Sequence, residues 1–135
     1  MINNAGIMQV GPFETLDEKI SKLTMDVNCM SNLYIVKEFL PEMIKRDEGH
    51  IVTVSSLCGV AAVPNLTDYA ASKFASVGFS EALMAEMVSN NRNITVTLAC
   101  PYFFDSGMFK DVKHRFILPL LKMEKVADRI IYGIT

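Results

Sequence analysis

The fold is best predicted from Gly49-His50-Ile51-Val52-Thr53-Val54-Ser55-Ser56, near the middle of the chain. Its β-branched residues are typical of a buried strand, predicted over residues 51–55. Downstream, apolar residues at helical spacing predict a helix over residues 69–89. A turn follows, and Ile94-Thr95-Val96-Thr97-Leu98-Ala99 predicts another strand that ends at Pro101.

The segments on either side continue this alternation. Ile2-Asn3-Asn4 predicts a short strand, and Thr15-Leu16-Asp17-Glu18 has the form of a capping box from which a helix begins. An apolar stripe carries that helix toward Ile44, and Pro41 is expected to bend it or to begin a second segment. Residues 126–134 predict a last helix. Strands that alternate with helices indicate parallel βαβ units and the α/β class.

Composition excludes several classes of protein. The chain has 135 residues, of which 50% are hydrophobic, so it can bury a core and is not disordered as a whole. Thirteen basic residues stand against fifteen acidic ones without a basic patch, which argues against nucleic acid as a partner. The uncharged stretch 49–67 contains serines, an asparagine and a proline, so no transmembrane helix is expected, and the first residues have no signal-peptide pattern.

Cysteine and histidine usage predicts no metal. Cys29, Cys58 and Cys100 are odd in number and form no Cys-x-x-Cys pair, so we expect buried reduced thiols. His50 and His114 are the two imidazoles of the chain, too few for a histidine metal site.

Polar residues follow the predicted strands where ligands gather in an open parallel sheet. Tyr69 and Lys73 lie one helical turn apart, so they share a face. A phenol of pKa about 10 needs a nearby cation to act as a base at neutral pH. Ser56, at a strand end, would hold a substrate oxygen opposite that phenol. The alternative is a half-buried tyrosine beside a solvated lysine, a pair that is common by chance.

These residues together resemble the short-chain dehydrogenase/reductase family. The order and the separations match over nearly the whole chain, through Asn3-Asn4-Ala5-Gly6, Asn28, Ser56, Tyr69-Ala70-Ala71-Ser72-Lys73 and residues 101–108. The resemblance implies a three-layer, Rossmann-like parallel sheet. By that pattern this chain holds strands four to six of the family fold with their crossover helices.

The resemblance also implies the roles of four catalytic residues. Tyr69 would be the general base of alcohol oxidation and the acid of carbonyl reduction, and Lys73 would lower its pKa and hold the nicotinamide ribose. Ser56 would orient the reacting oxygen. Asn28 would support a water that links Lys73 to solvent, although in isolation it reads as a solvated helix asparagine. Ser55 is interpreted as a strand residue, because the family separation from the tyrosine selects Ser56.

NAD or NADP is the cofactor that the resemblance implies. Asn4, Ala5 and Gly6 would pass beside the adenine ribose, and Gly6 would let the backbone approach the cofactor. Phe104 and Ser106 stand where family members contact the nicotinamide carboxamide. Tyr102 replaces a glycine usual in the family, and Ser106 replaces a more common threonine.

Within the family, residues 49–54, 72–75 and 101–103 more closely resemble the branch of retinol dehydrogenases and 17-beta-hydroxysteroid dehydrogenases of the eleven/thirteen type. This branch implies a cytosol-facing enzyme that interconverts a lipophilic alcohol and its carbonyl at the endoplasmic reticulum membrane or a lipid droplet. The apolar run 116–121 would be a substrate lid, or a loop packed on the core. The basic residues of 110–115 would touch a membrane surface, or form a solvated loop.

The family's glycine-rich pyrophosphate turn and its ribose-reading residue have no counterpart in the sequence. Residues 1–135 are therefore expected to be a partial, amino-terminally truncated domain with weak cofactor binding. An alternative hypothesis is an inactive isoform that associates with full-length subunits. The helices at 15–46 and 69–89, through which family members pair, would carry that association or a homo-oligomer.

Overall fold

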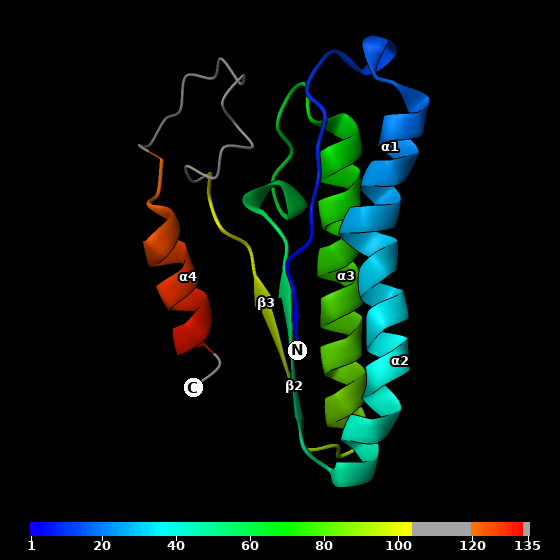
Figure 1. Ribbon diagram of the computed structural model, residues 1–135, viewed down its shortest axis with the longest axis vertical. Helices are drawn as coiled ribbons and strands as arrows, with labels where there is room; N and C mark the ends of the chain where they lie inside the picture. Colours follow the sequence, from blue (N-terminus) through cyan, green and yellow to red (C-terminus); the bar gives the residue numbers. More distant parts are fainter. Residues whose placement is uncertain (104–119, 134–135) are drawn as a thin grey trace.

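The computed structural model describes residues 1–103 and 120–133, and Phe104 and Ser106 lie outside them. Its strands are β1 (Ile2–Asn3), β2 (Gly49–Val54) and β3 (Ile94–Ala99). They form a parallel sheet in the order β1-β2-β3 (Figure 1). In the register, Ile2 pairs with Val52 and Val54 pairs with Ala99. The predicted parallel α/β sheet is confirmed.

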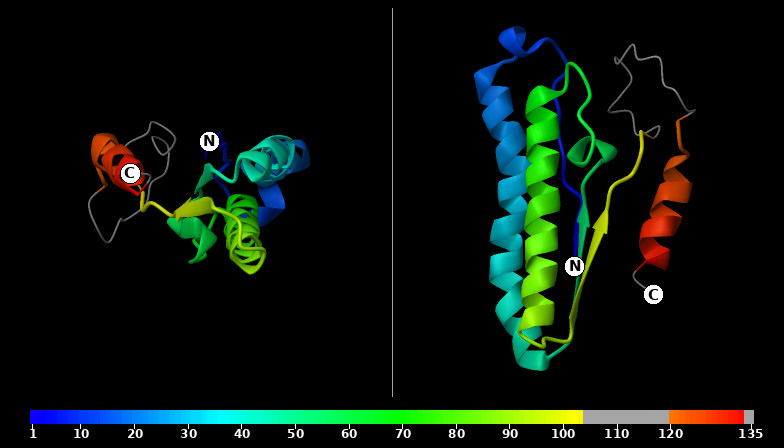
Figure 2. Two further views of the ribbon diagram at one scale, coloured as in Figure 1. Left: turned by 90° about the horizontal axis from the view of Figure 1, so that it is seen from below. Right: turned by 180° about the vertical axis from the view of Figure 1, so that it is seen from behind.

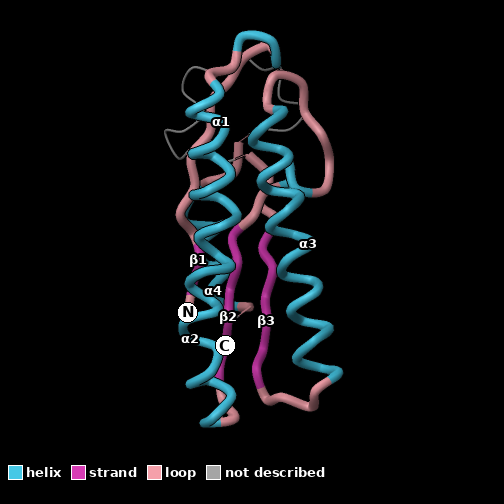
Figure 3. The backbone as a smooth tube through the Cα atoms, turned by 90° about the vertical axis from the view of Figure 1, so that its right-hand side faces the viewer, coloured by secondary structure: helices cyan, strands magenta, loops and turns pink. Residues whose placement is uncertain are grey.

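Helices cover both faces of this sheet. One face carries α3 (Thr67–Ser89) and a continuous helical rod made of α1 (Glu18–Met25), a π-helical turn (Asp26–Met30) and α2 (Ser31–Arg46). On the other face lies α4 (Met123–Tyr132), as the views of Figure 2 show. Figure 3 shows the strands side by side behind the rod and α3. The three-layer arrangement is therefore confirmed.

The first helix begins later than the capping box predicts. Asp17 caps α1, because its Oδ1 accepts hydrogen bonds from the backbone N–H of Lys19 at 2.7 Å and of Ile20 at 3.2 Å. Thr15 instead ends a 3₁₀ turn, and its hydroxyl donates to the Pro12 carbonyl at 2.9 Å. The expected role of Thr15 as the cap is wrong, because its hydroxyl is already used within the preceding turn.

The irregular part of the long helix is also elsewhere than predicted. The helix α2 continues through Pro41, so no second segment begins there. The departure from α-helical geometry is the π-helical turn, which contains Asn28. Such turns are frequent at functional sites.

Two apolar clusters hold the layers together. Between the sheet and the helices α2 and α3, the buried residues are Val36, Met43, Ile51, Leu83, Met87, Ile94 and Val96. A second cluster of Cys58, Leu66, Tyr69 and Phe103 lies beyond the carboxyl ends of the strands. The first cluster fixes the sheet on its helices, and the second surrounds one of the residues predicted to be catalytic.

Three small residues of α3, Ser72, Ser76 and Ser80, are fully buried. Their short side chains let α3 approach the neighbouring helical rod closely. All three cysteines are free thiols, of which Cys29 and Cys58 are buried. In the described ranges, no helix is long and apolar enough to cross a membrane, and no three acidic, cysteine or histidine side chains gather as metal ligands would.

Candidate active site

The segments that follow the strands meet at one edge of the sheet, as the sequence predicts. Pairing continues past β2 and β3, because the Ser55 N–H donates to the Ala99 carbonyl at 2.8 Å and the Leu57 N–H donates to the Pro101 carbonyl at 2.9 Å. A cavity of about 520 Å³ opens at this edge. Its lining comprises Asn4, Ala5, Gly6, Val54, Ser55, Ser56, Tyr69, Lys73, Pro101, Tyr102, Phe103, Met123, Val126, Ala127 and Ile130.

Most of the residues predicted from the sequence are brought together here. Six of them line the cavity: Asn4, Ala5, Gly6, Ser56, Tyr69 and Lys73. Asn28 lies directly behind the loop, since a Cβ built on Gly6 would be 3.5 Å from Asn28 Oδ1 and 3.6 Å from Lys73 Nζ. The basic residues of 110–115 and most of the apolar run 116–121 fall, like Phe104 and Ser106, outside the described residues.

Tyr69 and Lys73 project from the first turns of α3 and are both buried, with 5% and 4% of their surface exposed. The Lys73 ammonium lies 5.7 Å from the centre of the Tyr69 ring and donates to the Val54 carbonyl at 3.1 Å. The alternative of a solvated lysine beside a half-buried tyrosine is therefore wrong. Burying an ammonium is costly, and such cost is typical of functional positions.

The two serines that follow β2, Ser55 and Ser56, have different hydrogen-bond partners. The Ser56 Oγ accepts from the Cys58 N–H at 3.1 Å, and the Ser56 hydroxyl acts to lower the pKa of Tyr69. The Ser55 Oγ donates to the Lys73 carbonyl at 3.0 Å, which ties β2 to α3. Ser55 also lines the cavity, one residue beyond the end of β2.

Asn28 is 1% exposed, which contradicts the reading of a solvated helix asparagine. Its Oδ1 accepts from the Ile7 N–H and its Nδ2 donates to the Ile7 carbonyl, both at 2.8 Å. The same Nδ2 donates to the Ser72 Oγ at 2.9 Å, and that hydroxyl donates to the Tyr69 carbonyl at 2.7 Å. Asn28 thereby links the loop after β1 to the turn of α3 that carries Tyr69.

Burial shifts the pKa values of both Tyr69 and Lys73. Burial raises the pKa of Tyr69 above its ordinary value, and the Ser56 hydroxyl opposes that shift. Burial also lowers the pKa of Lys73, while Cys100 and Cys58 act to raise it. Burial is thus the largest influence on the pKa of Tyr69. That Lys73 lowers this pKa stays a prediction.

Sequence reasoning missed the wall of the cavity that α4 supplies. Met123, Val126, Ala127 and Ile130 occupy positions i, i+3, i+4 and i+7, so they share one face of this helix, and all four line the cavity. That spacing is the feature of the sequence from which an apolar helix face could have been predicted here. Tyr102 and Phe103 add a second apolar wall, with ring centres 5.2 Å apart and planes at 73°.

Comparison with known proteins identifies proteins whose sequences are similar to this chain. The family model of the short chain dehydrogenases matches residues 1–115. The 17-beta-hydroxysteroid dehydrogenase 13 of Rattus norvegicus is 41% identical, over 99% of this chain and 45% of the relative. Epidermal retinol dehydrogenase 2 of Homo sapiens is 37% identical, over 99% of this chain and 44% of the relative. The chain thus spans less than half the length of these relatives.

Solved structures agree on the fold. A 4-hydroxyisoleucine dehydrogenase complexed with NADH has a TM-score of 0.84 at 26% identity, over 99% of this chain and 60% of that one. A short chain dehydrogenase from Burkholderia cenocepacia J2315 in complex with NADP has a TM-score of 0.85 at 25% identity, over 98% of this chain and 54% of that one. The chain therefore belongs to the short-chain dehydrogenase/reductase family, in the branch of the retinol and 17-beta-hydroxysteroid dehydrogenases.

Proposed function

We propose that the chain carries the catalytic part of an NAD(P)-dependent oxidoreductase that interconverts a lipophilic alcohol and its carbonyl. The observation that carries this proposal is the convergence of Ser56, Tyr69 and Lys73 on one cavity at the carboxyl edge of the sheet. A hydroxyl, a phenol and an ammonium at such an edge suit proton transfer to or from an oxygen atom.

In this proposal Tyr69 exchanges the proton of the substrate oxygen and Ser56 orients that oxygen. The raised pKa of Tyr69 favours the neutral phenol, which is the form that donates a proton when a carbonyl is reduced. Alcohol oxidation needs the phenolate, which the Lys73 ammonium favours whenever it is charged. Asn28 holds the loop backbone at Ile7 and so keeps this loop against the site.

The cavity floor has features that suit a nicotinamide nucleotide, and relatives of known structure hold NADH or NADP. Lys73 donates one hydrogen bond to Val54, and an ammonium has three N–H groups, so it can also bind ribose hydroxyls. Gly6 has no side chain, which leaves space in front of Asn28 Oδ1 and Lys73 Nζ. When bound, the nicotinamide supplies or accepts the hydride. Phe104 and Ser106 are proposed to contact its carboxamide.

The lining supports a lipophilic substrate. Apolar and aromatic side chains from two elements form the walls, among them Tyr102, Phe103, Met123, Val126 and Ile130. Pockets of this kind bind apolar ligands, and a few polar groups set the orientation. Retinol-like or steroid-like alcohols fit this description, as the names of the relatives suggest.

Turnover of such an alcohol tests the proposal. The chain is incubated with retinol or a steroid alcohol and with NAD or NADP, and formation of the reduced cofactor is followed by absorbance. Tyr69→Phe should lower the rate by at least about a hundredfold, because it removes the acid-base group. Tyr132→Phe removes an exposed phenol from α4 and should leave the rate unchanged. Equal loss in both variants, or an unchanged rate in Tyr69→Phe, would contradict the role of Tyr69.

A second candidate function is association without turnover, with a full-length subunit or a second copy of the chain as the partner. The observation in its favour is a set of exposed apolar residues on the helices of one face, including Tyr34 at 65%, Phe39 at 56% and Phe74 at 45%. Apolar surface of this kind is typical of protein contacts. A chain that forms a dimer but never turns over an alcohol would favour this candidate over the first.

A further inference from the structure

A buried carboxylate stands directly beside Tyr69 and has no role in the chemistry described so far. Asp68 is 9% exposed and is the second residue of α3. Its Oδ1 accepts from the Tyr69 N–H at 2.7 Å. Its Oδ2 accepts from the Gln9 Nε2 at 2.7 Å and from the Ser21 Oγ at 2.9 Å. These donors and the positive end of the helix dipole compensate the buried charge.

Gln9 connects this carboxylate to two other segments. Its Nε2 also donates to the Ser21 Oγ at 2.8 Å and to the Asp17 carbonyl at 3.0 Å. Its Oε1 accepts from the Asp17 N–H at 3.1 Å. One glutamine thus joins the loop after β1 to the start of α1 and, through Asp68, to the start of α3.

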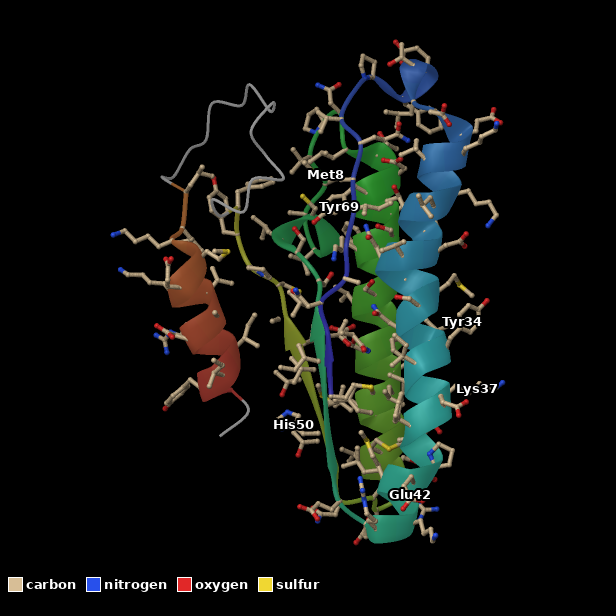
Figure 4. All side chains as sticks on the ribbon, viewed as in Figure 1. Met8, Tyr34, Lys37, Glu42, His50 and Tyr69 are labelled. Carbon is tan, nitrogen blue, oxygen red and sulfur yellow. The ribbon has the colours of Figure 1, made fainter. Side chains whose placement is uncertain are left out.

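The same loop is fixed on both sides of Met8. Ile7 is bound through its N–H and its carbonyl by Asn28, and Gln9 is bound as described above. Met8 itself packs against the cluster that contains Tyr69 and Phe103. In Figure 4 Met8 and Tyr69 lie near each other, between the loop and the upper part of α3.

We propose that Gln9 and Asp68 are positioning residues that hold Met8 against Tyr69 and fix the first turn of α3, from which the phenol projects. Neither residue lines the cavity, so each acts through Met8 and the α3 backbone. The effect on turnover rests on the proposed function, whereas the effect on Met8 does not.

The test exchanges the donor and the acceptor of this pair. Gln9→Glu places a second carboxylate oxygen at hydrogen-bond distance from Asp68. The backbone of the cap residue Asp17 also contacts Gln9, while the Asp17 carboxylate accepts from the N–H groups of Lys19 and Ile20. Two carboxylates this close share one proton, so the contact should hold near pH 5 and open near pH 8. Asp68→Asn places a donor opposite the Gln9 donor. The double variant restores one donor and one acceptor, with their positions exchanged.

Two readouts follow the exchange. The first is the methyl resonance of Met8 in protein labelled with ¹³C-methyl methionine, assigned with Met8→Leu. The second is kcat and KM between pH 5 and 8. We expect each single variant to shift the Met8 resonance and to lower kcat about tenfold at pH 8, with the cofactor KM within about twofold. Gln9→Glu should recover both near pH 5, and the double variant should recover most of both at pH 8.

Controls separate this proposal from general instability and from the proposed function. Glu18→Gln removes an exposed carboxylate from the first turn of α1 and should change neither readout. Recovery of Gln9→Glu at low pH shows within one sample that the variant folds. An unmoved Met8 resonance in both single variants, or a double variant no better than either one, would overturn the proposal. A natural chain without turnover would refute the proposed function, and the Met8 resonance would still decide whether the contact positions Met8.

Discussion

At the scale of single residues, Lys73 combines a stability cost with a candidate catalytic role. Burial lowers its pKa below the ordinary 10.5. Lys73→Met keeps most of the side-chain length and removes the charge, so we expect the variant to be more stable at pH 7 by about 1 kcal/mol. The same change should abolish turnover.

The pH dependence of that gain has a definite sign. Below the lowered pKa, the folded natural chain holds a buried charge that the unfolded chain would hydrate. Between that pKa and 10.5 the unfolded state binds more protons than the folded state, so the natural chain gains stability as the pH rises. The advantage of Lys73→Met in urea unfolding should therefore shrink from pH 7 to pH 10. An advantage that grows with pH would contradict this, and the exposed Lys19→Met supplies the control.

Two glycines of the site region provide a matched pair. A Cβ on Gly59 would lie 2.7 Å from the Lys73 carbonyl oxygen and 2.8 Å from the Ser55 Oγ, whereas a Cβ on Gly78 meets nothing within 4 Å. Gly59→Ala should destabilise the chain by about 1–3 kcal/mol, because backbone must move. Gly78→Ala, at an exposed position inside α3, should stabilise it by about 0.5–1 kcal/mol. Urea unfolding of both variants checks this, and effects of equal sign would contradict it.

The part of the site that could be predicted from the sequence depends on local geometry. Tyr69 and Lys73 share a helix face because they are four residues apart. Ser56 follows a strand of a parallel sheet, and the carboxyl ends of such strands face the ligand cavity. The contact between Asn28 and Ile7 joins residues 21 positions apart. The contact between Gln9 and Asp68 joins residues 59 positions apart. Neither contact follows from a helical or strand repeat in the sequence, so neither could be predicted from it.

At the scale of elements, the start of α1 gives a direct test of capping. The Asp17 carboxylate accepts two helix N–H groups, whereas the Thr15 hydroxyl is bound to Pro12. Asp17→Ala should therefore cost about 1 kcal/mol of stability. Thr15→Ala, in an exposed turn, should cost less than about 0.5 kcal/mol. Thermal unfolding of both variants measures the difference, and a larger cost for Thr15→Ala would restore the capping box that the sequence suggests.

The π-helical turn shows why the long helix could be predicted from the sequence and its local geometry could not. The apolar stripe continues from α1 into α2 and fixes the helical rod, and an inserted residue changes the register without ending the helix. The Asn28 carbonyl accepts from the Ser76 Oγ at 2.7 Å and from the Asn32 Nδ2 at 3.0 Å. Side chains of two helices therefore support this turn. Such support becomes visible only when α3 is packed against the rod.

At the scale of the whole molecule, the sheet and its two helical layers follow from the alternation of strands and helices. That alternation does not explain the exposed apolar side chains on the outer side of the rod, among them Tyr34, Ile35 and Phe39. Tyr34 and Lys37 project from α2 away from the sheet (Figure 4). Phe39, on the same helix, is 56% exposed, as is Ile131 of α4 on the opposite layer. Because Phe39 and Ile131 are equally exposed on opposite layers, substituting each in turn distinguishes a specific interface from non-specific hydrophobic association.

If two copies pair through the rod, Phe39→Glu places a charge in the contact and Ile131→Glu does not. We expect Phe39→Glu to weaken dimerisation at least about tenfold, which corresponds to about 1.4 kcal/mol. Ile131→Glu should leave it unchanged, because α4 covers the other face of the sheet. Light scattering coupled to size-exclusion chromatography over a concentration series measures both. A natural chain that stays monomeric would rule out a second copy as the partner, and equal weakening by both variants would assign the association to exposed apolar surface in general.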